Sequence, residues 1–370
     1  MSSLRFLTVL LLAAISQNGF AADDFKPFIA YGASASEQEL VAVKFDTVDG
    51  QLKAKVVQRE RLGIEAAPVL FHAENRQLYV ASLRAKLDNG NKFIVFNVGD
   101  DGTFTNRREF QLNHGAAHLS FDQTGRYLLT ASYFAGHIDV YRIGKGGSLS
   151  ESICNIYENR DKAHAIRVTN DNRFAYVPYV KDQNAMFQYS FDSKTGQLKP
   201  LKPAQAKVGD GTGPRHMAYH PTKALIYFSN EQHCGTSTFQ INKNGTLKLI
   251  QVCDAGPQLP LPKVAASDIE ITADGKFVFV GVRDFADGKV DSIHRFQTKD
   301  DGTLTHLGGT PADAIPWGLQ VSPSGKYLLV TASKGNTLTA YEITKDGDLK
   351  KTLVIGWGQT IRDIAVVVLK

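Results

Sequence analysis

The chain has 370 residues, of which 43% are hydrophobic and 21% charged, a composition that indicates a packed core and excludes disordered, collagen-like and coiled-coil proteins. The net charge of +5 is spread along the chain without a basic run, so we expect no nucleic-acid partner. Three cysteines without a Cys-x-x-Cys pair exclude a disulfide scaffold, and we expect neither a metal nor another cofactor.

Residues 1–21 have the pattern of a cleaved export signal. Arg5 supplies a positive start, residues 6–15 are apolar, and Gly19 and Ala21 are small residues placed for cleavage after Ala21. The apolar stretch reaches about half of the roughly 20 residues that span a membrane, so an anchor is the weaker interpretation. We expect residues 22–370 to form one domain that works in a periplasm or outside the cell, without membrane attachment.

A turn signal recurs along the rest of the chain. In each copy, a glycine preceded by a polar or small residue follows one apolar strand and introduces the Leu or Phe of the next. The intervals between these glycines are 45 to 57 residues. The seven glycines are Gly50, Gly102, Gly147, Gly196, Gly245, Gly302 and Gly347.

A second repeated pattern, two apolar strands joined by a tight turn, has the same period. Its six complete copies are Pro68–Ser82, His118–Ser132, Ala165–Tyr179, His216–Asn230, Asp268–Val282 and Gly318–Ala332. A seventh copy is split, with Ile364–Val368 able to pair with Phe28–Tyr31. Four short strands per unit of about 50 residues predict an all-β, seven-bladed β-propeller with four-stranded blades, its ring closed by the N- and C-terminal strands in one blade. A pair of β-sandwiches is the alternative.

Two positions in each copy are expected to lie at the same rim of the propeller, because the first two strands of a blade are antiparallel. The leading position precedes each copy and holds Ala67, Ala117, His164, Arg215, Ser267 and Trp317. The trailing position follows each copy and holds Leu83, Tyr133, Val180, Glu231, Arg283 and Ser333. The four ionisable or histidine residues fall in three consecutive blades.

These four residues form our candidate catalytic group. Arg215 and Glu231 are equally spaced from the turn at Lys223, which predicts that they face each other. Taken by itself, such a pair is explained by a structural ion pair between neighbouring strands. The neighbouring blades add His164 and Arg283, which favours a site. Arginines with a carboxylate and a histidine suit an oxygen-rich substrate whose carbonyl develops negative charge. We expect His216, Asn230, Tyr133 and Trp317 to contact the substrate, and we rank His118 lower.

Motifs of other enzyme classes are absent from the sequence. There is no Gly-x-Ser-x-Gly, lactamase-type Ser-x-x-Lys, His-Glu-x-x-His, phosphate-binding loop or Gly-x-Gly-x-x-Gly. A covalent nucleophile is therefore not indicated, and water is the expected nucleophile.

The motifs at these positions are characteristic. Gly213–Met217, Ser229–Glu231, Ala266–Ile269, Thr272–Lys276 and Val282–Asp284 resemble the seven-bladed lactonase family, which contains bacterial 6-phosphogluconolactonases and fungal carboxymuconate cyclases. The likeness covers nearly the whole mature chain. It implies a propeller that opens or closes lactone rings without a metal. In the muconate branch it implies catalytic roles for a His, two Arg and a Glu, which match His164, Arg215, Glu231 and Arg283.

One departure bears on the substrate. Many family members have Pro-Arg where this chain has Pro316-Trp317, so an arginine that could hold a phosphate is missing, and Arg362 is a possible replacement. Sugar phosphates are also kept in the cytoplasm, whereas this chain carries an export pattern. We expect hydrolysis of a free aldono-1,5-lactone, with Arg215 and Arg283 on the lactone and Glu231 or His164 as the base. A muconate-type cycloisomerase and a non-catalytic binding propeller remain the alternatives, and the oligomeric state is open.

The cysteines allow one further expectation. A four-residue loop at Asn242–Gly245 would place Cys234 opposite Cys253 on paired strands, close enough for a disulfide, whereas a two-residue loop would separate them. Cys154 is then an unpaired buried thiol.

Overall fold

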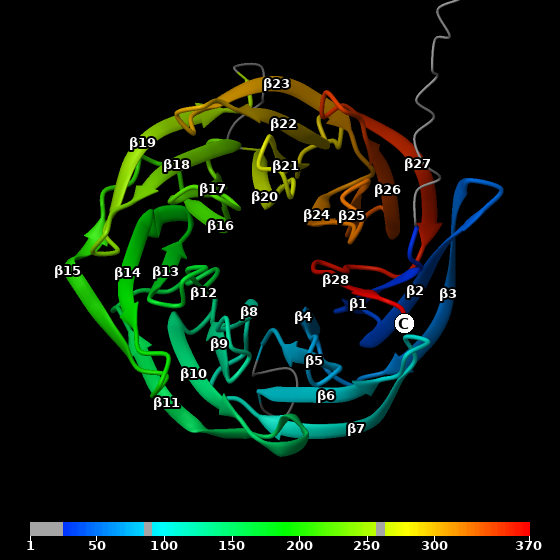
Figure 1. Ribbon diagram of the computed structural model, residues 1–370, viewed down its shortest axis with the longest axis horizontal. Helices are drawn as coiled ribbons and strands as arrows, with labels where there is room; N and C mark the ends of the chain where they lie inside the picture. The colour runs from blue at the N-terminus through cyan, green and yellow to red at the C-terminus, as the bar shows by residue number, and fades with distance from the viewer. Residues whose placement is uncertain (1–24, 85–90, 257–262) are drawn as a thin grey trace, which may run out of the picture.

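The computed structural model describes residues 25–84, 91–256 and 263–370, which form seven four-stranded sheets arranged in a ring (Figure 1). The export signal expected at residues 1–21 lies outside the described residues. Within the described ranges, the only helical elements are single 3-10 turns at Lys145–Gly147 and Lys181–Gln183. The predicted all-β, seven-bladed propeller is confirmed.

Each blade runs from an inner strand to an outer strand, with antiparallel neighbours, and the first three blades follow the ring from the N-terminus (Figure 1). Blade 1 contains, from inside outwards, β28 (Ala365–Val368), β1 (Phe28–Ser34), β2 (Glu39–Val48) and β3 (Gln51–Arg61). Blade 2 contains β4 (Ala66–His72), β5 (Gln77–Ser82), β6 (Lys92–Val98) and β7 (Phe104–Gln111). Blade 3 contains β8 (His118–Phe121), β9 (Tyr127–Ala131), β10 (His137–Ile143) and β11 (Leu149–Tyr157).

The remaining four blades have the same order. Blade 4 contains β12 (Arg167–Val168), β13 (Phe174–Tyr179), β14 (Ala185–Phe191) and β15 (Leu198–Ala206). Blade 5 contains β16 (Pro214–Tyr219), β17 (Leu225–Asn230), β18 (Gly235–Ile241) and β19 (Leu247–Asp254). Blade 6 contains β20 (Val264–Ile271), β21 (Phe277–Asp284), β22 (Ser292–Thr298) and β23 (Leu304–Pro311). Blade 7 contains β24 (Pro316–Val321), β25 (Tyr327–Ala332), β26 (Thr337–Ile343) and β27 (Leu349–Gly356).

Burial follows the position of a strand in its blade. The second strand of every blade is buried along its whole length, because neighbouring blades cover both of its faces. The outer strands, such as β7 and β27, alternate between sheltered and exposed residues. The continuous apolar runs in the repeats therefore correspond to the second strands, and the alternating runs correspond to the outer strands.

The ring closes as the sequence predicts. In blade 1, β28 pairs with β1, and Phe28 lies opposite Val368. This pairing joins segments more than 330 residues apart, and Ile29 and Val367 continue the core between blades 1 and 2.

Six of the seven repeated glycines pack against the preceding blade, and Gly50 has open space beside it. All seven have positive φ, between 71° and 84°, as the turn between the two outer strands requires. The Gly302 turn of blade 6 lies directly against Leu225 of blade 5, and the Tyr227 hydroxyl donates to the Gly302 carbonyl at 3.1 Å. A side chain at Gly302 would therefore displace the neighbouring blade.

The inner strands carry an extra residue at the level of the leading position. In blade 5, Pro214 faces Asn230 and Met217 faces Phe228, so that Arg215 and His216 together face one residue. The same shift occurs in β4, β20 and β24. A β-bulge of this kind redirects side chains, and it is common beside active sites.

This bulge corrects the predicted register of Arg215 and Glu231. The two residues are not direct partners, because the Glu231 backbone N–H donates to Gly213, two residues before Arg215. Counting from Lys223 was already one residue off at the turn, where Tyr219 pairs with Ile226, and the bulge adds a second residue to the shift.

The predicted pairing of Cys234 with Cys253 is also wrong. Ile241 lies opposite Leu247, and a second irregularity in β18 and β19 brings Cys253 opposite Thr236. Cys234 lies before β18, in a turn with φ of 50°. All three cysteines are free, and Cys154 is half-buried instead of fully buried.

Candidate active site

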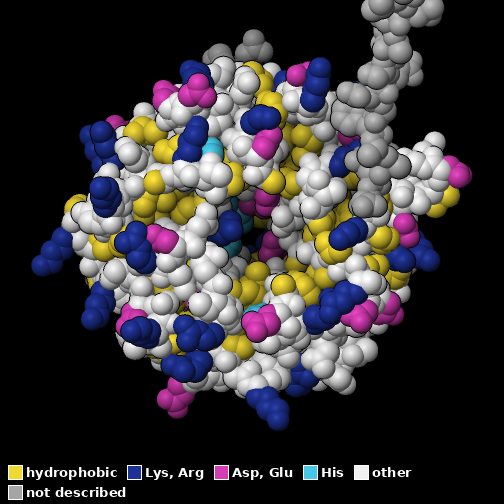
Figure 2. Space-filling view, in the orientation of Figure 1, with side chains coloured by type: hydrophobic (Ala, Val, Ile, Leu, Met, Phe, Trp, Pro, Cys, Tyr) yellow, Lys and Arg dark blue, Asp and Glu magenta, His cyan; other side chains and the backbone are white. Residues whose placement is uncertain are grey.

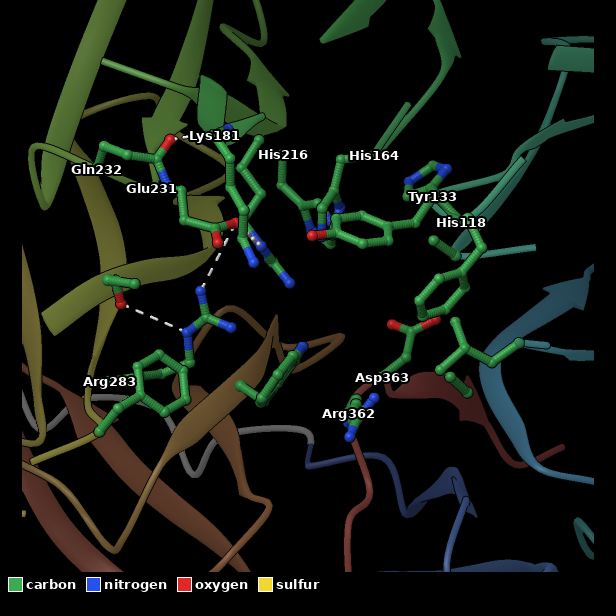
Figure 3. Close-up of a pocket in the computed structure, with 18 of the residues that line it drawn as sticks. His118, Tyr133, His164, Lys181, His216, Glu231, Gln232, Arg283, Arg362 and Asp363 are labelled. Atoms are coloured by element: carbon green, nitrogen blue, oxygen red, sulfur yellow. Dashed lines mark hydrogen bonds and ion pairs between the residues drawn. The ribbon is translucent and has the colours of Figure 1, made fainter. Parts of the chain in front are cut away.

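A cavity of about 500 Å³ lies where the inner strands and the turns that follow the second strands converge. Side chains from several blades point into it from opposite sides (Figure 3). Nine of the twelve leading and trailing positions line this cavity, while Ser267, Val180 and Ser333 do not. The nine are Ala67, Leu83, Ala117, Tyr133, His164, Arg215, Glu231, Arg283 and Trp317.

The structure brings together seven of the eight residues chosen from the sequence. His164, Arg215, Glu231, Arg283, His216, Tyr133 and Trp317 all line the cavity. Asn230 does not: it is fully buried in β17, where its Oδ1 accepts a hydrogen bond from the Ser237 hydroxyl at 2.9 Å. Asn230 thus belongs to the wall behind Glu231.

A carboxylate between two buried guanidinium groups forms one side of the cavity. Glu231 Oε2 lies 3.1 Å from Arg215 Nε. It also lies 3.8 Å from Arg283 Nη2 (Figure 3). Arg283 Nη2 also donates to the Ala266 carbonyl at 2.5 Å, which fixes its direction. Arg215 is 1% exposed, yet its Nη1 has no hydrogen-bond partner among the described residues. An unpaired buried donor costs about 1–3 kcal/mol, and a ligand oxygen in the cavity would satisfy it.

The cavity carries an excess of positive charge. Its lining contains the cations Arg84, Lys181, Arg215, Arg283 and Arg362, against the carboxyl groups of Glu231 and Asp363. Burial, followed by the charge of Arg215, lowers the pKa of Arg283 to about 9. Burial raises the pKa of Asp363 to about 7, which weakens its negative charge. An anionic ligand or a developing oxyanion is therefore favoured.

Three of these arginines surround one indole ring. The guanidinium carbons of Arg283, Arg362 and Arg215 lie 4.4, 4.7 and 5.7 Å from the centre of the Trp317 ring. Stacking on an aromatic face holds a guanidinium group flat while its N–H groups stay available at its edge. Arg362 Nε is one of the buried atoms without a partner among the described residues.

Arg362, suggested from the sequence only as a replacement for the arginine missing at position 317, lines the cavity. Ile361 bridges to Ser34, and Ala365 pairs with Tyr31, so Arg362 occupies the leading position of blade 1. The repeat rule would have found it if it had been extended to the split copy. Asp363 follows it in the bulge, as His216 follows Arg215.

A group of three imidazole rings lies opposite the arginines. The ring of His216 is 4.9 Å from that of His164 and 5.5 Å from that of His118, centre to centre. Burial is the main cause that lowers the pKa of all three, so they are neutral at pH 7. His118, ranked low from the sequence, lines the cavity at the start of β8, where it lies opposite Ala131.

A second cavity of about 510 Å³ meets the first along the axis. The two share His118, His216 and Asp363 as lining residues. Basic, acidic and histidine side chains are also visible inside the central opening of the face in Figure 2. His216 therefore lies at the junction of the two cavities.

Within the described part of the chain, no three His, Cys, Asp or Glu side chains are grouped so that they could hold a metal ion. The same part contains no helix that is both long and apolar enough to cross a membrane.

The comparison with protein families matches residues 28–355 to the family model described as lactonase, 7-bladed beta-propeller. The chain belongs to this lactonase family. The match runs from β1 into β27 and includes Arg215, Glu231 and Arg283, and it ends before β28 of blade 1.

Solved structures share the fold of this lactonase at low sequence identity. A periplasmic gluconolactonase from Pseudomonas aeruginosa is 20% identical, with a TM-score of 0.80 over 93% of this chain and 100% of the other. A 6-phosphogluconolactonase candidate from Bacteroides fragilis is also 20% identical, with a TM-score of 0.80 over 94% and 100% of the two chains. A similar candidate from Bacteroides uniformis is 18% identical, with a TM-score of 0.79 over 93% and 100%.

Proposed function

We propose that this protein hydrolyses a sugar lactone of the aldono-1,5 type to the open-chain acid. The observation that carries the proposal is the pair of buried arginines on Glu231, with Arg215 Nη1 unpartnered at the cavity wall. Membership of the lactonase family and the fold shared with a gluconolactonase support the same chemistry.

The arrangement suits attack by water on a lactone carbonyl. The carbonyl oxygen gains negative charge in the tetrahedral intermediate, and the guanidinium groups of Arg215 and Arg283 are placed to bind it. One such donor contributes about 3 kcal/mol to lowering the barrier. A base beside the arginines removes the proton from water, a task open to the neutral rings of His164 and His216 and to the Glu231 carboxylate by position. Such assistance contributes about 10² to 10⁴-fold.

Glucono-1,5-lactone is the substrate that we propose. We propose that the enzyme works in a periplasm or outside the cell, where free aldonolactones arise by sugar oxidation, and the export pattern at residues 1–21 supports this. The similar Pseudomonas aeruginosa protein is a periplasmic gluconolactonase. One observation favours the 6-phosphate ester as a second candidate: Arg362, 4.7 Å from the Trp317 ring, supplies a cation that the sequence at position 317 lacks. We also propose that the protein binds no nucleic acid and is not attached to a membrane.

A pH-stat assay tests the proposal. Purified protein spanning residues 22–370 is given glucono-1,5-lactone and its 6-phosphate in parallel, with spontaneous hydrolysis subtracted. We expect one proton released per lactone opened, at a rate well above the spontaneous one, with the phosphate ester no better than the free lactone. No enzymatic rate on either compound would refute lactonase activity, and a preference above tenfold for the ester would reverse the choice of substrate.

A further inference from the structure

His216 and Asp268 form a hydrogen-bonded pair between neighbouring blades. His216 Nδ1 lies 2.7 Å from Asp268 Oδ1, and the two residues hold equivalent second bulge positions in β16 and β20. The bulge turns His216 toward the axis, so that its ring reaches the cavity although Arg215 precedes it in the same strand.

Asp268 is held as a fixed carboxylate. Its Oδ1 also accepts the backbone N–H of Ile269 at 2.9 Å, and its Oδ2 accepts that of Leu319 in blade 7 at 3.0 Å. Although burial opposes ionisation, His216 and these two N–H groups together keep the pKa of Asp268 below its ordinary value. An ionised carboxylate only accepts hydrogen bonds, so His216 Nδ1 must carry the proton.

The other ring nitrogen of His216 is then a free base. With the proton on Nδ1, Nε2 presents a lone pair, and this buried atom has no hydrogen-bond partner among the described residues. The side chain as a whole is 16% exposed and lines both cavities. The titratable and charged groups around it, from every packed element, are His118, His164, Arg215, Asp268 and Arg283.

The two residues chosen as bases from the sequence are less suited to this task. Glu231 is engaged by the guanidinium groups of both Arg215 and Arg283. His164 has no carboxylate against its ring, and its Nδ1 is unpartnered among the described residues. An imidazolium formed at His216 gains an ionised partner at 2.7 Å, whereas one formed at His164 does not.

We propose that His216 is the general base of the lactonase reaction and that Asp268 is its positioning residue, an inference that rests on the proposed function. His216 Nε2 takes a proton from water, and the freed oxygen lone pair forms the bond to the lactone carbonyl carbon. The carbonyl π electrons move to the oxygen held by the arginines. When the intermediate collapses, the ring C–O bond breaks, and the proton on Nε2 passes to the departing ring oxygen. The product is the hydroxy acid, and His216 is neutral again.

Asp363 provides an internal comparison. It holds the same bulge position in blade 1, and its two oxygens accept the N–H groups of Ile364 and Val69 at 2.9 and 3.0 Å. No imidazole is hydrogen-bonded to it among the described residues. The contact to the next blade is therefore a structural role that Asp268 and Asp363 share, and the bond to His216 is additional.

Three variants separate these roles. His216→Asn keeps an N–H near the Nδ1 position but has no base, and we expect its kcat to fall about 10²-fold or more. Asp268→Asn should lower kcat and move the acidic limb of the pH profile of kcat/KM to lower pH, because the pKa of His216 loses the partner that raises it. Asp363→Asn should lose comparable thermal stability but move that limb less than Asp268→Asn does, because Asp363 makes no hydrogen bond to His216 among the described residues. Nitrogen-15 NMR of histidine-labelled wild type should show the proton of His216 on Nδ1.

The possible failures are distinct. A wild-type enzyme that opens lactones, together with a His216→Asn variant within threefold of it, would overturn the assignment of the base and leave the function standing. A His216 protonated on Nε2, or a limb that stays in place in Asp268→Asn, would overturn the positioning role. A wild type that opens no lactone would overturn the proposed function, and the base role with it.

Discussion

Glu231 makes two buried arginines compatible with one another. Arg215 and Arg283 are 1% and 2% exposed, and both lie within 4 Å of the Glu231 carboxylate. Glu231→Gln leaves two cations without a counter-charge, and removing one partner from a buried ion pair costs about 3–5 kcal/mol. We expect turnover to fall at least tenfold and the free energy of unfolding to fall by about 3 kcal/mol, as measured by initial rates and urea denaturation.

A surface glutamate provides the control for this variant. Glu109 forms an exposed ion pair with Lys92 at 3.1 Å, and Glu109→Gln should change stability by less than about 0.5 kcal/mol. Glu231→Gln with wild-type turnover would show that the carboxylate has no part in the reaction.

Arg362 is the residue that should distinguish the two candidate substrates. Its guanidinium group stacks on Trp317, with Nε unpartnered among the described residues. If it binds a phosphate, Arg362→Ala should lower kcat/KM for the 6-phosphate ester at least tenfold more than for free glucono-1,5-lactone. Equal losses on both substrates would mean that Arg362 acts on the lactone ring or on the fold.

Glu270 should make stability depend on pH. It lines the second cavity beside Asp268, and burial first and Asp268 second raise its pKa to about 8. The folded state therefore retains a proton that the unfolded chain loses near pH 4.5, so this group makes stability fall as pH rises from about 4.5 to 8. Glu270→Gln should reduce that fall, as measured by urea denaturation at pH 5 and pH 8. An unchanged difference between the two pH values would refute the raised pKa.

At the scale of strands and turns, the glycines of six outer hairpins are points of contact between blades, and Gly50 is the exception. Gly302 has φ of 84° and lies against Leu225, whereas Gly50 has φ of 71° and open space beside it. Gly50→Ala should therefore cost only the backbone strain, about 1–2 kcal/mol. Gly302→Ala should cost at least 2 kcal/mol more, because blade 5 must also move. Equal midpoints of urea denaturation for the two variants would contradict an interlock between blades.

The blades and most cavity residues were predictable from the sequence, whereas the register of individual strands was not. The turn glycines and the apolar repeats indicated seven blades, and the leading and trailing positions located Arg215, Glu231 and Arg283 at one cavity. The register around Arg215 was not predictable, because a bulge leaves no signature in a run of apolar and polar residues. The loop at Asn242–Gly245 likewise allowed two registers. Neither holds along the whole of β18 and β19, because the register shifts between Thr238 and Phe239.

For the molecule as a whole, ring closure and cavity formation depend on the same segment. Val367 is 4% exposed between blades 1 and 2, and Arg362 and Asp363 precede it by a few residues. Val367→Asp buries a charge at this junction and should remove more than about 3 kcal/mol of stability along with the lactonase activity. Val368→Asp, on the exposed side of the same strand at 36% exposure, is the matched control and should retain both. Circular dichroism and the pH-stat assay measure the two effects.

The chain has two tryptophans, and their surroundings differ. Trp357 is 1% exposed in the apolar cluster between blades 7 and 1, whereas Trp317 lies in the cavity wall beneath three guanidinium groups. Indole emission shifts with the electric field around the ring, and a bound anion would cancel part of the field of those cations. In a Trp357→Phe background, the remaining fluorescence is that of Trp317 alone. Its emission would then titrate directly with any ligand that enters the cavity, including product acids and lactones that are never turned over.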